Sequence, residues 1–133
     1  MTVDELQRCL HHHFAPWVRS LPLHVQQRSD NSLTLTLAAD AQLYDASGAL
    51  SAQVYAVAAQ TAMSLALTRS ESDLSTMHCM AFNMNVMNTR YANSVTLVAS
   101  ILRRGRSVAF GEISLYDQQS QLVAHASATY TLH

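Results

Sequence analysis

The feature that most constrains this chain is a long apolar stretch between Ser47 and Arg69. This stretch predicts a helix of about six turns in which apolar residues occupy nearly every side. A helix that is apolar all round either spans a membrane or lies buried in a protein core. A thin polar seam and the alternating segments that follow favour a buried core helix surrounded by the rest of the chain. The seam consists of Ser51, Gln53, Gln60, Thr61 and Ser64.

Length and composition limit the classes of protein to which the chain can belong. Its 133 residues predict a single domain over residues 1–133. Charged residues make up only 13%, so a large share of the chain is expected in a core or an interface. A net charge of −1 without a basic run argues against nucleic-acid binding.

The two cysteines and the N-terminal residues predict the compartment. Cys9 and Cys79 lack the paired spacing of a disulfide framework or a zinc site. The N-terminal segment carries Asp4 and Glu5 and has no apolar signal-peptide region. We therefore expect a cytoplasmic protein with no metal, no cofactor and no membrane span.

The segments before and after the apolar stretch complete an α+β pattern. Thr2 and Glu5 have the spacing of a capping box, which predicts an N-terminal helix. Strict alternation from Leu33 to Leu37 predicts a half-buried strand. Further alternating runs cover residues 79–86, 95–102, 108–115 and 122–131. Strands of ten to twelve residues span roughly 33–40 Å, which suits a curved antiparallel sheet that wraps the long central helix.

Several short motifs resemble those of hot-dog thioesterases. Ser47-Gly48-Ala49-Leu50 stands where that family has a Gly-Gly turn at the start of its helix. Asn88 to Ala92 is similar to the family's "R-P-A" turn, with Tyr91 in place of proline, and Gly105-Arg106-Ser107 resembles its "G-R-S" turn. The segment from Asp117 to Ala126 resembles "D-x-x-G-x-L-V-A-x-A", with Ser120 in place of glycine.

From Leu43 onward the chain thus resembles PaaI-like and related acyl-CoA thioesterases, and also the thioesterase-like domains fused to some bacterial acetyltransferases. The resemblance implies a hot-dog fold, a homodimer or tetramer, and an acyl thioester of coenzyme A or acyl carrier protein as the ligand.

One departure from the family pattern leaves two functions open. PaaI-like enzymes carry a catalytic Asp or Glu about eight residues into the helix, where this chain has Tyr55 and Ala56. No acidic residue lies between Ala46 and Ser70. The protein is therefore either a thioester hydrolase with another catalytic arrangement or a non-catalytic acyl-binding or assembly module that has lost the acid.

The candidate catalytic residues are Asp45, Gly48, Ala49 and Gln60. Backbone N–H groups near Gly48 and Ala49 are predicted to begin the helix and to form an oxyanion hole, although a tight turn also requires glycine. Asp45 is a candidate general base or a turn residue at the helix N-terminus. Gln60 is a candidate to hold the attacking water.

The candidate substrate-binding residues come from the helix, the following strand and two turns. Asn83 and Asn85 are poor strand formers on one face, so they are expected at a dimer seam or against ligand. The strand between Met77 and Met87 is predicted to pair with its own copy. Arginines at the 103–106 hairpin either hold coenzyme A phosphates or are solvated. The complete set is Ser47, Tyr55, Asn83, Asn85, Arg90, Arg104 and Arg106.

Overall fold

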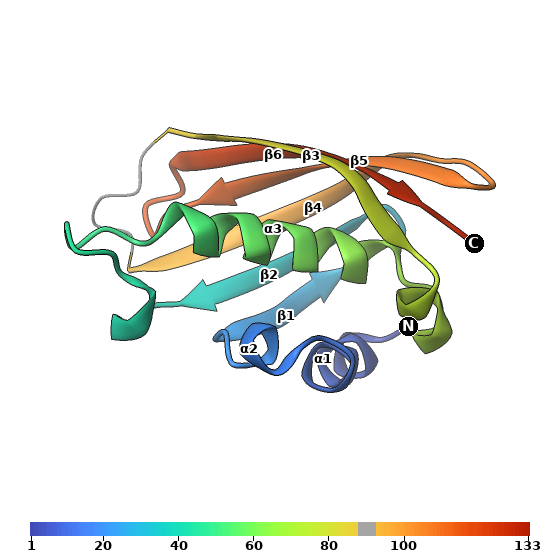
Figure 1. Ribbon diagram of the computed structural model, residues 1–133, viewed down its shortest axis with the longest axis horizontal. Helices are drawn as coiled ribbons and strands as arrows, with labels where there is room; N and C mark the ends of the chain where they lie inside the picture. The colour runs from blue at the N-terminus through green and yellow to red at the C-terminus, as the bar shows by residue number, and fades with distance from the viewer. Residues whose placement is uncertain (88–92) are drawn as a thin grey trace.

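The computed structural model describes residues 1–87 and 93–133, and it shows a long helix packed on an antiparallel sheet (Figure 1). This arrangement confirms the predicted α+β class. The elements, in chain order, are α1 (Val3–His12), α2 (Pro16–Arg19), β1 (Leu23–Arg28), β2 (Ser32–Ala38), η1 (Ala41–Leu43), α3 (Ala52–Leu67), η2 (Glu71–Ser75), β3 (His78–Val86), β4 (Ser94–Arg104), β5 (Val108–Tyr116) and β6 (Leu122–Thr131).

The six strands lie in the order β1-β2-β4-β5-β6-β3, and each neighbouring pair is antiparallel. Alternate residues face α3, as predicted for β2 and β4. Leu35 and Leu97, which are register partners on these two strands, are both fully buried. The core therefore lies between the sheet and the helix.

The central helix begins later than the sequence predicted. It starts at Ala52, where the Ser51 hydroxyl accepts a hydrogen bond from the Gln53 amide as an N-cap. Gly48 has φ of +84°, a left-handed conformation that a helix cannot contain. The N–H of Ser51 donates to the carbonyl of Leu43, which ties the preceding loop back on itself. The 16 residues of α3 span about 24 Å, so the helix is shorter than the predicted helix of about six turns.

The expected facing of β3 also needs correction at one position. Phe82 and Met84 pack against the core as predicted, but Met80 is 62% exposed. A bulge between Cys79 and Ala81 shifts the register, so that Cys79 takes the inward position instead of Met80.

The N-terminal segment folds over the β1 edge of the sheet (Figure 1). The capping box of Thr2 and Glu5 begins α1, as predicted. The Gln7 side chain on α1 accepts a hydrogen bond from the Val25 amide at 2.7 Å and donates to the Leu23 carbonyl at 3.3 Å. The short helix α2, which begins at Pro16, was not predicted.

Candidate functional site

An apolar groove lies between α2 and the outward side of α3. One cavity of ≈ 190 Å³ is lined by Phe14, Trp17, Val57 and Gln60, among others. A second of ≈ 140 Å³ is lined by Trp17, Leu21, Gln53, Val54 and Val57. Trp17 and Val57 line both cavities, so we treat the two as one groove, which we call the α2–α3 groove. Trp17 is 61% exposed, which is unusual for so large an apolar side chain.

The polar side chains of this groove come from one stripe of α3. Gln53, Val57, Gln60 and Ser64 follow one another at spacings of four, three and four residues, which places them on one face. Ser64 donates to the Gln60 carbonyl at 3.0 Å. Gln60 was predicted as a catalytic candidate, whereas Gln53, which belongs to the same polar seam of the helix, was not predicted as a site residue.

The turn before α3 brings four predicted residues together around the Asp45 carboxylate. One carboxylate oxygen accepts hydrogen bonds from the Ser47 amide at 2.9 Å, from the Ser47 hydroxyl and from the Ala49 amide at 3.3 Å. The Gly48 amide donates to the Asp45 carbonyl at 3.0 Å. The amides of Gly48 and Ala49 therefore belong to this turn and not to the helix.

These bonds also make Asp45 a weak base. Hydrogen bonds from the hydroxyl and the amide of Ser47 hold the pKa of the Asp45 carboxyl below its usual value. Its side chain is exposed, so burial does little to oppose this effect. A carboxylate stabilised in its charged form accepts a proton less readily than an ordinary one.

Tyr55 lies inside the fold and away from the α2–α3 groove. Its side chain is fully buried, and its hydroxyl has no hydrogen-bond partner among the described residues. Burial raises the pKa of Tyr55 to about 12, and the nearby Asp117 and Tyr44 add to the increase. The hydroxyl is therefore neutral under ordinary conditions.

Asn83 and Asn85 lie on the face of the sheet opposite α3. Both side chains are exposed, and they alternate along β3 with the inward-facing Phe82 and Met84. Their register partners on β6 are Ser127 and His125. Within one chain, the sheet separates both asparagines from the α2–α3 groove.

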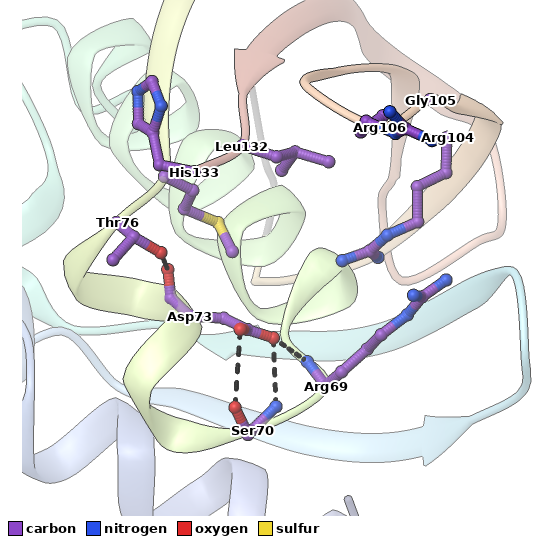
Figure 2. Close-up of a pocket in the computed structure, with 10 residues that line it drawn as sticks. Arg69, Ser70, Asp73, Thr76, Arg104, Gly105, Arg106, Leu132 and His133 are labelled. Atoms are coloured by element: carbon purple, nitrogen blue, oxygen red, sulfur yellow. Dashed lines mark hydrogen bonds between the residues drawn. The ribbon is translucent and has the colours of Figure 1, made fainter.

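Two of the predicted arginines, Arg104 and Arg106, lie far from the Asp45 turn. Both are at the β4–β5 hairpin, at the end of the molecule opposite the start of α3 (Figure 1). They line a pocket there together with Arg69, which was not predicted (Figure 2). Arg90 lies outside the described residues.

Within residues 1–87 and 93–133, no three His, Cys, Asp or Glu side chains are close enough together to hold a metal ion. Over the same ranges, no helix has both the length and the apolar character needed to cross a bilayer.

Solved structures of thioesterases resemble this chain over its full length. A thioesterase of Haemophilus influenzae matches with a TM-score of 0.86 and 21% identity, over 100% of this chain and 91% of the other. Zebrafish thioesterase superfamily member 2 matches with a TM-score of 0.85 and 17% identity, over 100% and 99%. A glutamine-to-alanine variant of a Pseudomonas aeruginosa thioesterase matches with a TM-score of 0.84 and 21% identity, over 99% and 94%.

The architecture is therefore the hot-dog fold, in which a sheet wraps a central helix, as the resemblance in sequence implied. Structures matched over the whole chain include those of hot-dog thioesterases. No family model and no curated protein matches the sequence. At these identities the structural likeness concerns the fold.

Proposed function

We propose that this protein binds an acyl thioester of coenzyme A or acyl carrier protein and hydrolyses it. The observation that supports this function is the α2–α3 groove, an apolar channel that begins at the first turn of α3 in a fold shared with thioesterases. The cytoplasm, where such thioesters are made and used, is the compartment that we propose.

The groove suits the acyl chain of such a ligand. Trp17, Val54 and Val57 line its apolar part. Each methylene that the groove removes from water contributes about 0.8 kcal/mol to binding. The affinity for the acyl group is therefore expected to increase with chain length until the groove is full.

The start of α3 suits the thioester carbonyl. Backbone N–H groups in the first turn of a helix have no acceptor within the helix, and this end carries a partial positive charge. The Gly48–Ala49 turn determines the direction from which the polypeptide enters α3. In α3 the Gln53 amide already donates to the Ser51 hydroxyl, and the Val54 and Tyr55 amides donate to the Ser51 carbonyl. In the proposed reaction, the Ala52 amide and the partial positive charge of this helix end therefore stabilise the oxyanion that forms when water attacks the carbonyl carbon.

A glutamine amide would position the attacking water. Gln53 lies at the start of α3, and Gln60 lies seven residues later, about 10.5 Å along the axis. Only one of them can therefore contact the water at a given carbonyl. When the tetrahedral intermediate collapses, the carbon–sulfur bond breaks, the thiolate leaves, and the proton of the water passes to solvent. A thiol pKa near about 8.5 makes the thiolate a good leaving group.

A non-catalytic acyl-binding module is a second candidate. The observation that favours it is the lack of Asp or Glu in α3, where the resembling enzymes carry their acid. Asp45 does not replace that acid well, because its carboxylate is already bonded to Ser47 and Ala49. Such a module would bind acyl-CoA without releasing thiol.

A panel of acyl-CoA substrates with short, medium and long chains tests both candidates. We expect Val57→Arg to reduce binding and turnover at least about tenfold, or 1.4 kcal/mol, because it places a charge in the groove. Val98→Arg makes the same change on β4, away from the groove, and serves as the matched control. Binding without thiol release would favour the module, and equal effects of the two variants would refute the groove as the site.

Variants of the turn and of the two glutamines assign the individual roles. Asp45→Asn should lower turnover less than threefold if no protein base acts, and about a hundredfold or more if Asp45 is the base. Gly48→Val forces a branched residue into a left-handed conformation, so its effect on turnover should be compared with its effect on melting temperature. Gln53→Ala and Gln60→Ala, measured side by side, identify which amide holds the water.

A further inference from the structure

Trp17 and Val57 mark the boundary between the two cavities of the α2–α3 groove. Both residues line both cavities, and the other lining residues divide between the cavities in chain order. The smaller cavity is lined by Leu21 from the N-terminal segment and Val54 from α3, whereas the larger one is lined by Phe14 and Gln60. The two segments therefore run in opposite directions along the groove. We call the two shared residues the Trp17–Val57 pair.

The backbone of Trp17 is held in place, whereas its side chain is mostly exposed. The Ser20 hydroxyl donates to the Trp17 carbonyl at 2.7 Å, and the Arg19 guanidinium donates to the His11 carbonyl of α1 at 3.2 Å. Val18, the next residue along α2, is buried. The indole is 61% exposed, and its N–H has no hydrogen-bond partner in the part of the chain that the structure describes. Other residues therefore hold α2 in position, and the indole is left in water at the groove.

The position of the pair along α3 determines which acyl chains reach it. In the proposed function the thioester carbonyl lies at the Ala52 amide, and Val57 is five residues further, about 7.5 Å along the helix axis. Ser64, the last residue of α3 that lines the larger cavity, is about 18 Å from Ala52. An extended chain advances roughly 1.2 Å per bond, because a polypeptide residue of three bonds spans about 3.6 Å. Acyl groups of about four carbons therefore end before the pair, whereas those of about eight to fourteen carbons extend beyond it.

We propose that Trp17 selects medium-chain acyl groups, of about eight to fourteen carbons, by covering the chain where it crosses the Trp17–Val57 pair. This role rests on the proposed function, because it takes the thioester to lie at the start of α3. A chain that reaches the pair contacts the indole, and a tryptophan side chain buries about 150–250 Å² when it is covered. A shorter chain leaves the indole in water. Contact with Trp17 therefore adds affinity for the longer chains alone.

Two ligands that cannot be hydrolysed test this role without requiring turnover. Butyl-CoA and dodecyl-CoA are thioethers, which have no carbonyl for water to attack; the longer one is used below the concentration at which it forms micelles. Trp17 is the single tryptophan of the chain, so tryptophan fluorescence reports on this position alone. We expect the emission to shift to shorter wavelength with dodecyl-CoA and not with butyl-CoA, because only the longer chain removes the indole from water.

Three variants assign the effect to the indole. Trp17→Ala should weaken calorimetric binding of dodecyl-CoA at least about tenfold, or 1.4 kcal/mol, and binding of butyl-CoA less than about twofold. Trp17→Phe keeps an aromatic ring, so it should retain most of the preference for the longer chain. Phe110→Ala is the matched control, because Phe110 is an exposed aromatic residue of β5 that does not line the groove. It should change neither affinity by more than about twofold.

The outcomes separate the role of Trp17 from the proposed function. Hydrolysis of acyl-CoA with the same chain-length preference in wild type and Trp17→Ala would overturn the role of Trp17 and leave the hydrolase standing. Loss of the preference in Trp17→Ala, in a protein that releases no thiol, would support the role of Trp17 and favour the non-catalytic module. Failure of both thioethers to bind would overturn both proposals. Emission that shifts with protein concentration in the absence of ligand would show that a second copy covers the indole, and would overturn the role of Trp17.

Discussion

The two edge strands of the sheet differ in how well other parts of the chain cover them and hydrogen-bond to their backbone. At the β1 edge, α1 lies alongside the strand and Gln7 bonds to the Val25 amide and the Leu23 carbonyl (Figure 1). At the β3 edge, Phe82 and Met84 are only half-buried and Met80 and Val86 are exposed. An edge strand with free backbone groups is a template for pairing with another strand.

This difference indicates which edge strand is free to pair with a strand of another subunit. Covering an edge strand with a helix protects it from pairing, as a charge or a proline on the edge also does. The chain uses such a device at β1, and β3 has one bulge near its start, between Cys79 and Ala81. We therefore keep the prediction that β3 pairs with its own copy across a two-fold axis.

The largest expected difference between the edges is in their inward-facing side chains. Leu23 on β1 is 1% exposed, so Leu23→Ala should lower the free energy of unfolding by about 2–5 kcal/mol. Met84→Ala on half-buried β3 should lower it by less than half of the Leu23→Ala loss. Denaturant unfolding at one fixed protein concentration measures both. Equal losses would mean that β3 is as well covered in solution as β1.

Charges on the two edges test association directly. The double variant Asn83→Lys, Asn85→Lys places four like charges near one another if β3 pairs with its copy. We expect the dissociation constant of the dimer to increase about a hundredfold, or 2.7 kcal/mol. Light scattering at micromolar concentration measures the change.

The same charges on the protected edge provide the control. His24→Lys, Gln26→Lys alters exposed side chains of β1 and should leave association unchanged. A wild-type protein that is a stable monomer at micromolar concentration would eliminate β3 pairing, and with it any site shared between subunits.

Removal of the Gln7 side-chain bonds should make the β1 edge resemble the β3 edge. Gln7→Leu leaves the part-buried Val25 amide without its acceptor, which should cost about 1–2 kcal/mol of unfolding free energy. The matched control is Gln26→Leu, because Gln26 makes an exposed side-chain hydrogen bond, to the Thr36 hydroxyl at 3.0 Å, and no backbone group depends on it. A loss as large in the control would show that the edge bonds of Gln7 contribute nothing specific.

Most of the fold could be predicted because it depends on periodicity. Alternation on β2 and β4 places the core leucines, and the apolar helix requires a sheet around it. The predicted start of α3 is wrong because Gly48 lies in a turn before the helix, whereas Ser51 is the N-cap and a favourable residue for that position. The bulge in β3 was missed because Met80 and Phe82 continue an apparently regular alternation.

The candidate sites were harder to predict because they depend on contacts between distant segments. Gln60 was found from its place on the helix, but Trp17 joins the groove only because α2 packs beside α3. Arg69 was missed for the same reason. It follows the end of α3, and only the fold brings it to Arg104 and Arg106 on the hairpin.

Acid should weaken the protection that α1 gives to the β1 edge. Hydrogen bonds with the backbone and side chain of Thr2 lower the pKa of Glu5, whose carboxylate completes the cap of α1. A group with a depressed folded pKa contributes stability above its unfolded pKa and loses it as the pH falls through the folded value. Below about pH 4, α1 should therefore fray, and the Val25 amide should exchange its hydrogen faster relative to the intrinsic rate.

The control variant Glu5→Gln keeps a capping side chain without the charge, so the protection of its Val25 amide should not vary with pH over this range. Amides of β3, which α1 does not cover, should show no such change in either protein. Protection at Val25 that stays constant through the acid range in the wild type would separate the capping of α1 from the protection of the β1 edge.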